Sequence, residues 1–237
     1  MDAASLSALW LALAPGLSAK AHVPPPTPTP AVLAEAAKGK VGRLSLPGKG
    51  VAAYGVIAMP MAEVWLSLTD DHLSDDVAGL TEVALHGHGA SPKVLYQRID
   101  LPWPFEDRQW VLRLENNAAL AAHCGAWERS WELDNSELSA SRERTDPAAF
   151  DAALALPTNR GSWILYPVDA THTFSIYQAW TDLGGNIPAE AAEAYTRSSL
   201  DDFYAGLVKH IAKVKARYGP GCKPEPGADG APIPCFP

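Results

Sequence analysis

LPWPFEDR, residues 101–108, joins two stretches in which large apolar and polar residues alternate, KVLYQRIDL (93–101) and QWVLRLEN (109–116). Alternation with a period of two is typical of half-buried strands. Two prolines fix the backbone of the connection, and Arg108 carries donors that suit loop carbonyls or acids. The three segments therefore predict two neighbouring strands joined by a rigid hairpin connection.

Strand and helix signals continue on both sides of this hairpin. The further expected strands are 50–59, 81–86, 125–133, 162–166 and 171–181. A short helix is expected after Pro60, and a long helix from Pro188 to Tyr218 has apolar residues at spacings of three and four. Residues 135–159 are polar and ambiguous, and a short strand or a loop is expected there. This order predicts an α+β fold in which a curved antiparallel sheet wraps around the C-terminal helix.

One face of the expected sheet carries most of the aromatic bulk. The alternation and the apolar stripe of the last helix predict this inward-facing set: Trp110, Leu112, Trp127, Arg129, Trp131, Leu165, Phe174, Ile176, Gln178, Trp180, Phe203, Leu207 and Ile211. Thr173, Ser175 and Tyr177 are assigned to the opposite face.

The inward face either packs solid or encloses an apolar cavity. Arg129 favours the cavity, because burying a guanidinium alone costs on the order of several kcal/mol and requires a partner or water. The alternative is a one-residue register shift or bulge that places Arg129 in solvent.

The composition excludes several classes of protein. The chain has 237 residues and a net charge of −8, so it lacks the dense basic face of a nucleic-acid binder. Its mean hydropathy is close to zero and no apolar run reaches twenty residues, which excludes a multi-span membrane protein.

His86 and His88 have no third ligand at a recognisable spacing, and no catalytic motif is present. We expect no metal or other cofactor, and we expect the acidic segment 70–76 to be a solvated helix end.

Proline-rich ends flank an interior domain, 31–219. Residues 1–21 contain an apolar run with the length of a signal-peptide core and small residues before Ala21, but Asp2 and the lack of a preceding Lys or Arg do not fit a leader. A frayed amphipathic helix and a truncated start are the alternatives. A leader would direct the protein to a periplasm or outside the cell. Residues 22–30 predict a stiff linker.

The tail, 220–237, is rich in proline and glycine and contains two cysteines. A disulfide between Cys222 and Cys235 would close the tail and would suit an oxidising compartment. Two unrelated cysteines in a tail without fixed structure are the alternative. Cys124 is expected to be a small buried residue.

Four segments in order carry a resemblance to a known superfamily. The proline hairpin at 96–112 resembles that of START lipid-transfer domains and their bacterial relatives. Segments 56–70 (VIAMPMAEVWLSLTD), 161–163 (GSW) and 181–188 (TDLGGNIP) resemble three further motifs of that superfamily. The junction residues of these motifs are Pro102, Pro104, Arg108, Gly184, Gly185 and Pro188. Gln109 departs from the pattern, which has an aspartate at that position.

The resemblance implies a helix-grip fold with a tunnel that holds one hydrophobic ligand, such as a sterol, a phospholipid or another lipid. The first function it implies is that of a non-catalytic monomer that binds and transfers this ligand and contacts a membrane transiently. The superfamily also includes polyketide aromatase/cyclases, the enzymatic alternative, although a leader or a disulfide argues against an enzyme that works with cytosolic carrier proteins. A third alternative, an interaction scaffold with a filled core, predicts no cavity.

Overall fold

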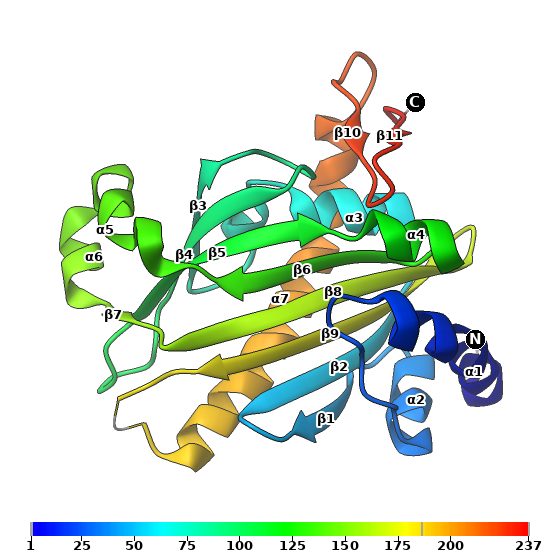
Figure 1. The fold of residues 1–237 in the computed structure, drawn as a ribbon, viewed down its shortest axis with the longest axis horizontal. Coiled ribbons are helices and arrows are strands. Elements are labelled where there is room, and N and C mark those ends of the chain that lie inside the picture. Colours follow the sequence, from blue (N-terminus) through cyan, green and yellow to red (C-terminus); the bar gives the residue numbers. More distant parts are fainter. Residues whose placement is uncertain (1, 186, 237) are drawn as a thin grey trace.

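The computed structural model describes residues 2–185 and 187–236, and its centre is a nine-stranded sheet (Figure 1). The strands are β1 (Gly42–Leu46), β2 (Gly50–Ile57), β3 (Leu80–His86), β4 (Lys93–Ile99), β5 (Arg108–Asn116), β6 (Trp127–Leu133), β7 (Leu154–Ala155), β8 (Thr158–Asp169) and β9 (His172–Asp182). Eight strands pair antiparallel in the order β1-β2-β9-β8-β6-β5-β4-β3, and β7 pairs in parallel with β5. β1 is not predicted from the sequence, and β7 lies in the ambiguous segment 135–159, for which a short strand or a loop is expected.

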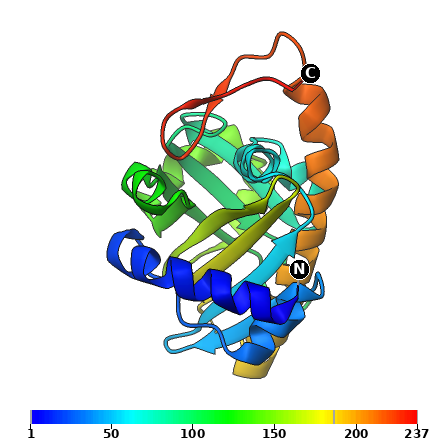
Figure 2. The same ribbon diagram turned by 90° about the vertical axis from the view of Figure 1, so that its right-hand side faces the viewer.

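Two helices cover one face of the sheet, here called the inner face. α3 (Met61–Thr69) follows β2 and α7 (Ala189–Arg217) follows β9, and each begins directly after a proline. Figure 2 shows α7 running along this face. Leu207, Ile211 and Val214 of α7 are fully buried in the core that α3 shares. The predicted helix-grip architecture, a sheet that packs around a long C-terminal helix, is confirmed.

The other face of the sheet, the outer face, is also covered. α1 (Ala3–Lys20), α2 (Pro30–Ala37) and α4 (Ala118–Cys124) pack over β2, β8 and β9 (Figure 2). Leu6, Trp10, Leu13 and Leu17 of α1 are buried there, at spacings of four, three and four. The segment after β6 covers β3, β4 and β5 with short helices, among them η2 (Asn135–Glu137), α5 (Leu138–Ser141), η3 (Arg142–Arg144) and α6 (Pro147–Ala152). Among the described residues, no helix is long and apolar enough to span a bilayer.

The segment predicted as a linker, 22–30, lies against the outer face. The backbone N–H groups of His22 and Val23 donate to the carboxylate of Glu128 at 2.8 and 3.1 Å. The Tyr54 hydroxyl donates to the carbonyl of Pro26. These bonds fix the proline-rich segment to the sheet.

The hairpin of β8 and β9 contains a β-bulge. Asp169 pairs with His172 across the turn, whereas Pro167 pairs with Thr173. Val168 is therefore an extra residue, and every pair before it is displaced by one position.

This displacement reverses the predicted faces of β9. Trp163 lies opposite Tyr177 rather than Gln178, so Tyr177 shares the inner face with Trp163. The prediction that β9 presents Phe174, Ile176, Gln178 and Trp180 inward is wrong, because these residues lie on the outer face. Burial could not reveal the error, since both faces of β9 are covered.

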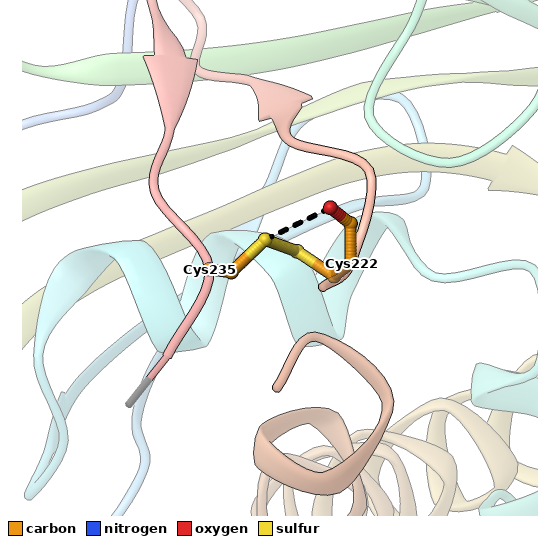
Figure 3. Close-up of a disulfide and its surroundings, with 2 residues drawn as sticks. All are labelled: Cys222 and Cys235. Carbon is orange, nitrogen blue, oxygen red and sulfur yellow. Dashed lines mark hydrogen bonds between the residues drawn. A yellow bond between two sulfur atoms is a disulfide. The ribbon is translucent and has the colours of Figure 1, made fainter. Parts of the chain in front are cut away.

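The tail packs against the domain. Cys222 and Cys235 form a disulfide (Figure 3), which closes a loop with the short pair β10 (Glu225–Pro226) and β11 (Pro232–Ile233). The indole N–H of Trp65 in α3 donates to the Pro226 carbonyl at 3.1 Å. Cys124 is half-buried in α4.

Candidate functional site

A cavity of about 990 Å³ lies between the inner face of the sheet and α7. Ligand pockets usually measure about 300–1,000 Å³, so this volume is at the upper end of that range. Its apolar walls come from strands β4, β5, β6, β8 and β9 and from α7, and they include Leu95, Leu114, Trp163, Tyr177, Leu200 and Phe203. The alternative of a solidly filled interior is therefore wrong.

The structure divides the predicted inward-facing residues into three groups. Those that line the cavity are Trp110, Leu112, Arg129, Trp131 and Phe203. Those that lie on the inner side but in the packed core outside the cavity lining are Trp127, Leu165, Leu207 and Ile211. α3 explains the second group, because it fills the space between β8, β9 and the C-terminal half of α7. The third group is the four β9 residues on the outer face.

Several cavity residues were missed by sequence reasoning. Tyr177, Ala179 and Thr181 face the cavity because of the bulge. Burial raises the pKa of the Tyr177 phenol far above its usual value of 10.0. Lys93 and Gln97 line the cavity from β4, and the alternation of β4 with Leu95 between them is the signal that could have found them.

Arg129 is almost completely buried at one end of the cavity, with 2% of its surface exposed. Its guanidinium donates to Asn116 Oδ1 at 2.9 Å, to the Ser91 carbonyl at 3.0 Å and to the Ala90 carbonyl at 3.2 Å. Its Nε has no hydrogen-bond partner among the described residues. Burial lowers the pKa of Arg129 to about 10, so the group stays protonated at neutral pH. The alternative that placed Arg129 in solvent is wrong.

Lys93 lies at the same end of the cavity and has a carboxylate partner. Its ammonium donates to Asp71 Oδ1 at 2.5 Å and to the Thr69 carbonyl at 3.0 Å. Burial lowers the pKa of Lys93 and raises that of Glu82, which accepts a hydrogen bond from Gln97. This end of the cavity is therefore polar, in contrast to its apolar walls.

The opposite end of the cavity is lined by the turn between β1 and β2 and by the loop after β9. Its residues Lys49 and Gly185 are exposed, whereas Lys93 and Arg129 at the far end are buried. The cavity therefore reaches the surface beside the loop after β9. Ile187 also lines this end, and Asn186 of the 181–188 motif lies outside the described residues.

Arg108 joins two of the sequence motifs at the exposed end of the cavity. Its buried side chain donates to the carbonyls of Leu183 at 2.5 Å, Asp107 at 3.2 Å and Gly184 at 3.4 Å, and also to that of Glu106. Gly184 and Gly185 have φ of 64° and 66°, a region that favours glycine, and a Cβ on Gly185 would lie 3.0 Å from Arg108 Nη2. The close approach of the loop to Arg108 therefore favours glycine at position 185.

Comparison with known proteins supports the fold. No family model and no curated protein sequence matches the chain. A STAR-related lipid transfer protein fragment from Xanthomonas axonopodis has a TM-score of 0.57 at 18% identity over 73% of this chain and 93% of its own. Human StAR-related lipid transfer protein 5 has a TM-score of 0.54 at 16% identity, over 73% of this chain and 82% of its own.

A third solved structure, a START superfamily protein from Mycobacterium smegmatis, has a TM-score of 0.50 at 8% identity, over 70% of this chain and 98% of its own. Identities this low carry information about the fold and none about the ligand. The architecture and the order of the four sequence motifs lead to the same conclusion: this chain has the START-like helix-grip fold, with a large cavity between the sheet and the C-terminal helix.

Proposed function

We propose that this protein binds a hydrophobic small molecule or lipid in its cavity, does not catalyse a reaction on it, and transfers it between membranes. The observation that supports this most is the mainly apolar lining of the 990 Å³ cavity between its exposed end and Arg129. Burial of apolar surface contributes about 25 cal/mol per Å², so such walls favour an apolar ligand over water. A sterol, a phospholipid or another lipid has the apolar surface to pack against these walls.

Native mass spectrometry after gentle purification tests the binding. We expect a bound mass that organic extraction removes, and we expect the extracted protein to take up a fluorescent sterol or phospholipid. The ligand should be recovered chemically unchanged, since a converted product would indicate an enzyme. A protein that carries nothing and binds neither probe would refute the proposal.

Filling the cavity should prevent binding. Ala179 lines the cavity on β9 and is 3% exposed, so Ala179→Trp puts an indole into the space that the ligand would occupy. We expect the affinity for the fluorescent lipid to fall at least tenfold, or about 1.4 kcal/mol, with little loss of thermal stability because the space is already there. Ala122→Trp, on the exposed surface of α4, is the matched control and should bind normally. Equal binding by both variants would contradict the proposed site.

Trp103 is the side chain we expect to contact the membrane. It lies in the β4–β5 loop with 93% of its surface exposed, and Arg108 ties this loop to the one that lines the exposed end of the cavity. Tryptophan favours the membrane–water interface, and burying a large apolar side chain contributes about 1.5–3 kcal/mol. Trp103→Ser should therefore weaken vesicle binding and slow lipid uptake by about tenfold, while equilibrium ligand content stays the same.

Leu11→Ser is the control for this change, since Leu11 is an exposed apolar residue (73%) on α1, over the outer face. Uptake from vesicles by the two variants should be measured side by side. If Leu11→Ser slows uptake as much as Trp103→Ser does, the loop has no special contact with the membrane.

A further inference from the structure

The charged side chains that line the cavity differ in whether they have an ionic partner. Lys93 pairs with Asp71 at 2.5 Å and Lys49 pairs with Asp182 at 2.7 Å. Two further ion pairs join Arg43 to Asp201 and Asp70 to Arg217. Within residues 2–185 and 187–236, the cavity-lining charges that form no ion pair are Arg129 and Glu82.

Arg129 is the cation of these two. Its three hydrogen-bond acceptors, Ala90 O, Ser91 O and Asn116 Oδ1, are all neutral, and its Nε is satisfied by no described residue. Neutral acceptors replace part of the lost hydration of a cation but do not compensate its charge. The buried end of the cavity therefore holds a protonated guanidinium with no counter-ion in direct contact. Asp71, whose negative charge acts on it, pairs with Lys93.

Glu82 does not supply that counter-ion in the structure. Its carboxyl group is hydrogen-bonded to the Gln97 amide, which in turn accepts from the Trp110 indole at 2.9 Å. Burial raises the pKa of Glu82 and so favours its neutral form. Both observations leave the charge of Arg129 available to a ligand.

The guanidinium is held in place from outside the cavity. The Ala90 carbonyl that it contacts also accepts from Asn116 Nδ2 at 2.7 Å, and the Ala90 N–H donates to Glu225 Oε2 at 3.0 Å. Glu225 belongs to β10 in the disulfide-closed tail. The tail therefore helps to fix the loop whose Ala90 and Ser91 carbonyls hold Arg129.

We propose that the ligand is an amphiphile with one anionic head group, which Arg129 binds at the buried end while the apolar chain extends toward the exposed end. This inference rests on the proposed function. A carboxylate or phosphate oxygen would accept one charge-assisted hydrogen bond from the free Nε–H. The chain would follow β4 from Lys93 to Ile99, a path of about 20 Å at roughly 3.3 Å per residue.

Four single-chain probes at pH 8 test this on the purified full chain after delipidation: oleate, oleoyl lysophosphatidate, oleyl alcohol and oleoyl lysophosphatidylcholine. Each is titrated below its micellar concentration by displacement of a fluorescent lipid. We expect at least one of the two anions to bind ten times more tightly than the neutral alcohol and the zwitterion. Oleate and lysophosphatidate then distinguish a carboxylate head from a phosphate head.

Arg129→Met should remove the preference for the anion and keep the binding of oleyl alcohol. Arg113→Met, an exposed arginine of β5 outside the cavity, is the matched control and should keep the preference. Equal binding of the alcohol and both anions by the unmodified protein, tighter binding of the zwitterion, or a preference that survives Arg129→Met would overturn the inference. The comparison among the four probes uses only the unmodified protein, so it still tests the inference if Arg129→Met does not fold. Failure of all four probes to bind would instead count against the proposed function.

Discussion

Replacing Arg108 with methionine should lower the free energy of unfolding by about 3–5 kcal/mol. The side chain is 1% exposed, and its donors satisfy four carbonyl groups in two loops. Methionine retains most of the apolar stem but donates nothing, so the carbonyls of Leu183 and Gly184 lose the hydrogen bonds that hold the loop leading into α7. The variant should therefore lose stability and, with the loop released, ligand binding as well.

Arg113→Met provides the matched control, because Arg113 lies on the same strand but is exposed and pairs with Asp134 at 2.5 Å. Exposed ion pairs contribute only about 0–1 kcal/mol, so this variant should unfold at nearly the denaturant concentration of the unmodified protein. Urea unfolding followed by tryptophan fluorescence measures both. A loss below about 1 kcal/mol for Arg108→Met would mean that the four carbonyl bonds do not hold the loops together.

The order of the elements could be predicted because local chemistry sets it. Proline at 60 and 188 begins α3 and α7, and the alternation in 93–116 matches β4 and β5 within about two residues at each end. β1 was not predicted, because its five residues (GRLSL) begin with Gly42 and follow Gly39, and so short a segment shows little of the alternation that is typical of a strand. Its strand character depends on pairing with β2.

The cavity walls were harder to predict because they depend on a single extra residue. Without the bulge at Val168, Trp163 would lie opposite Gln178, and the predicted faces of β9 would hold. Pro167 is the signal in YPVDATH that could have indicated the bulge, because proline inside a sheet is confined to edges, strand starts and bulges. The second difficulty is α1, whose buried residues cover the outer face and remove the polar–apolar contrast by which faces are assigned.

The apolar run in α1 also shows why a leader and a packed helix look alike in sequence. Trp10 and Leu13 are buried against the sheet in this structure, and a signal-peptide core would need the same kind of residues. The acidic segment 70–76 is a prediction that the structure contradicts in part. The prediction of a solvated helix end is wrong for Asp70 and Asp76, which are buried under α7, and only contacts distant in sequence could have revealed this.

Asp76→Asn should lower the free energy of unfolding at neutral pH by about 3 kcal/mol, because Asp76 joins η1 (Leu73–Asp76) to α7 through a charge cluster in which its own carboxylate and His210 are buried. Its carboxylate side chain is completely buried. It accepts hydrogen bonds from His210 Nδ1 at 2.8 Å and Lys213 Nζ at 2.7 Å, and Lys209 Nζ lies 3.0 Å away. Asparagine keeps the shape of the side chain but removes the negative charge that interacts with His210, Lys213 and Lys209.

The pH dependence of this loss distinguishes a charge effect from a packing effect. Hydrogen bonds from Lys213 and His210 hold the pKa of Asp76 well below its usual value of 3.8. A lowered pKa gives stability that is present above about 3.8 and lost as the pH falls toward the folded value, because the unfolded chain binds the proton first. The difference between the unmodified protein and Asp76→Asn should therefore be largest near pH 7 and shrink below about pH 3.8. Asp75→Asn, an exposed neighbour, should show no such difference in urea unfolding across this range, and a loss for Asp76→Asn that stays constant with pH would rule out the charge effect.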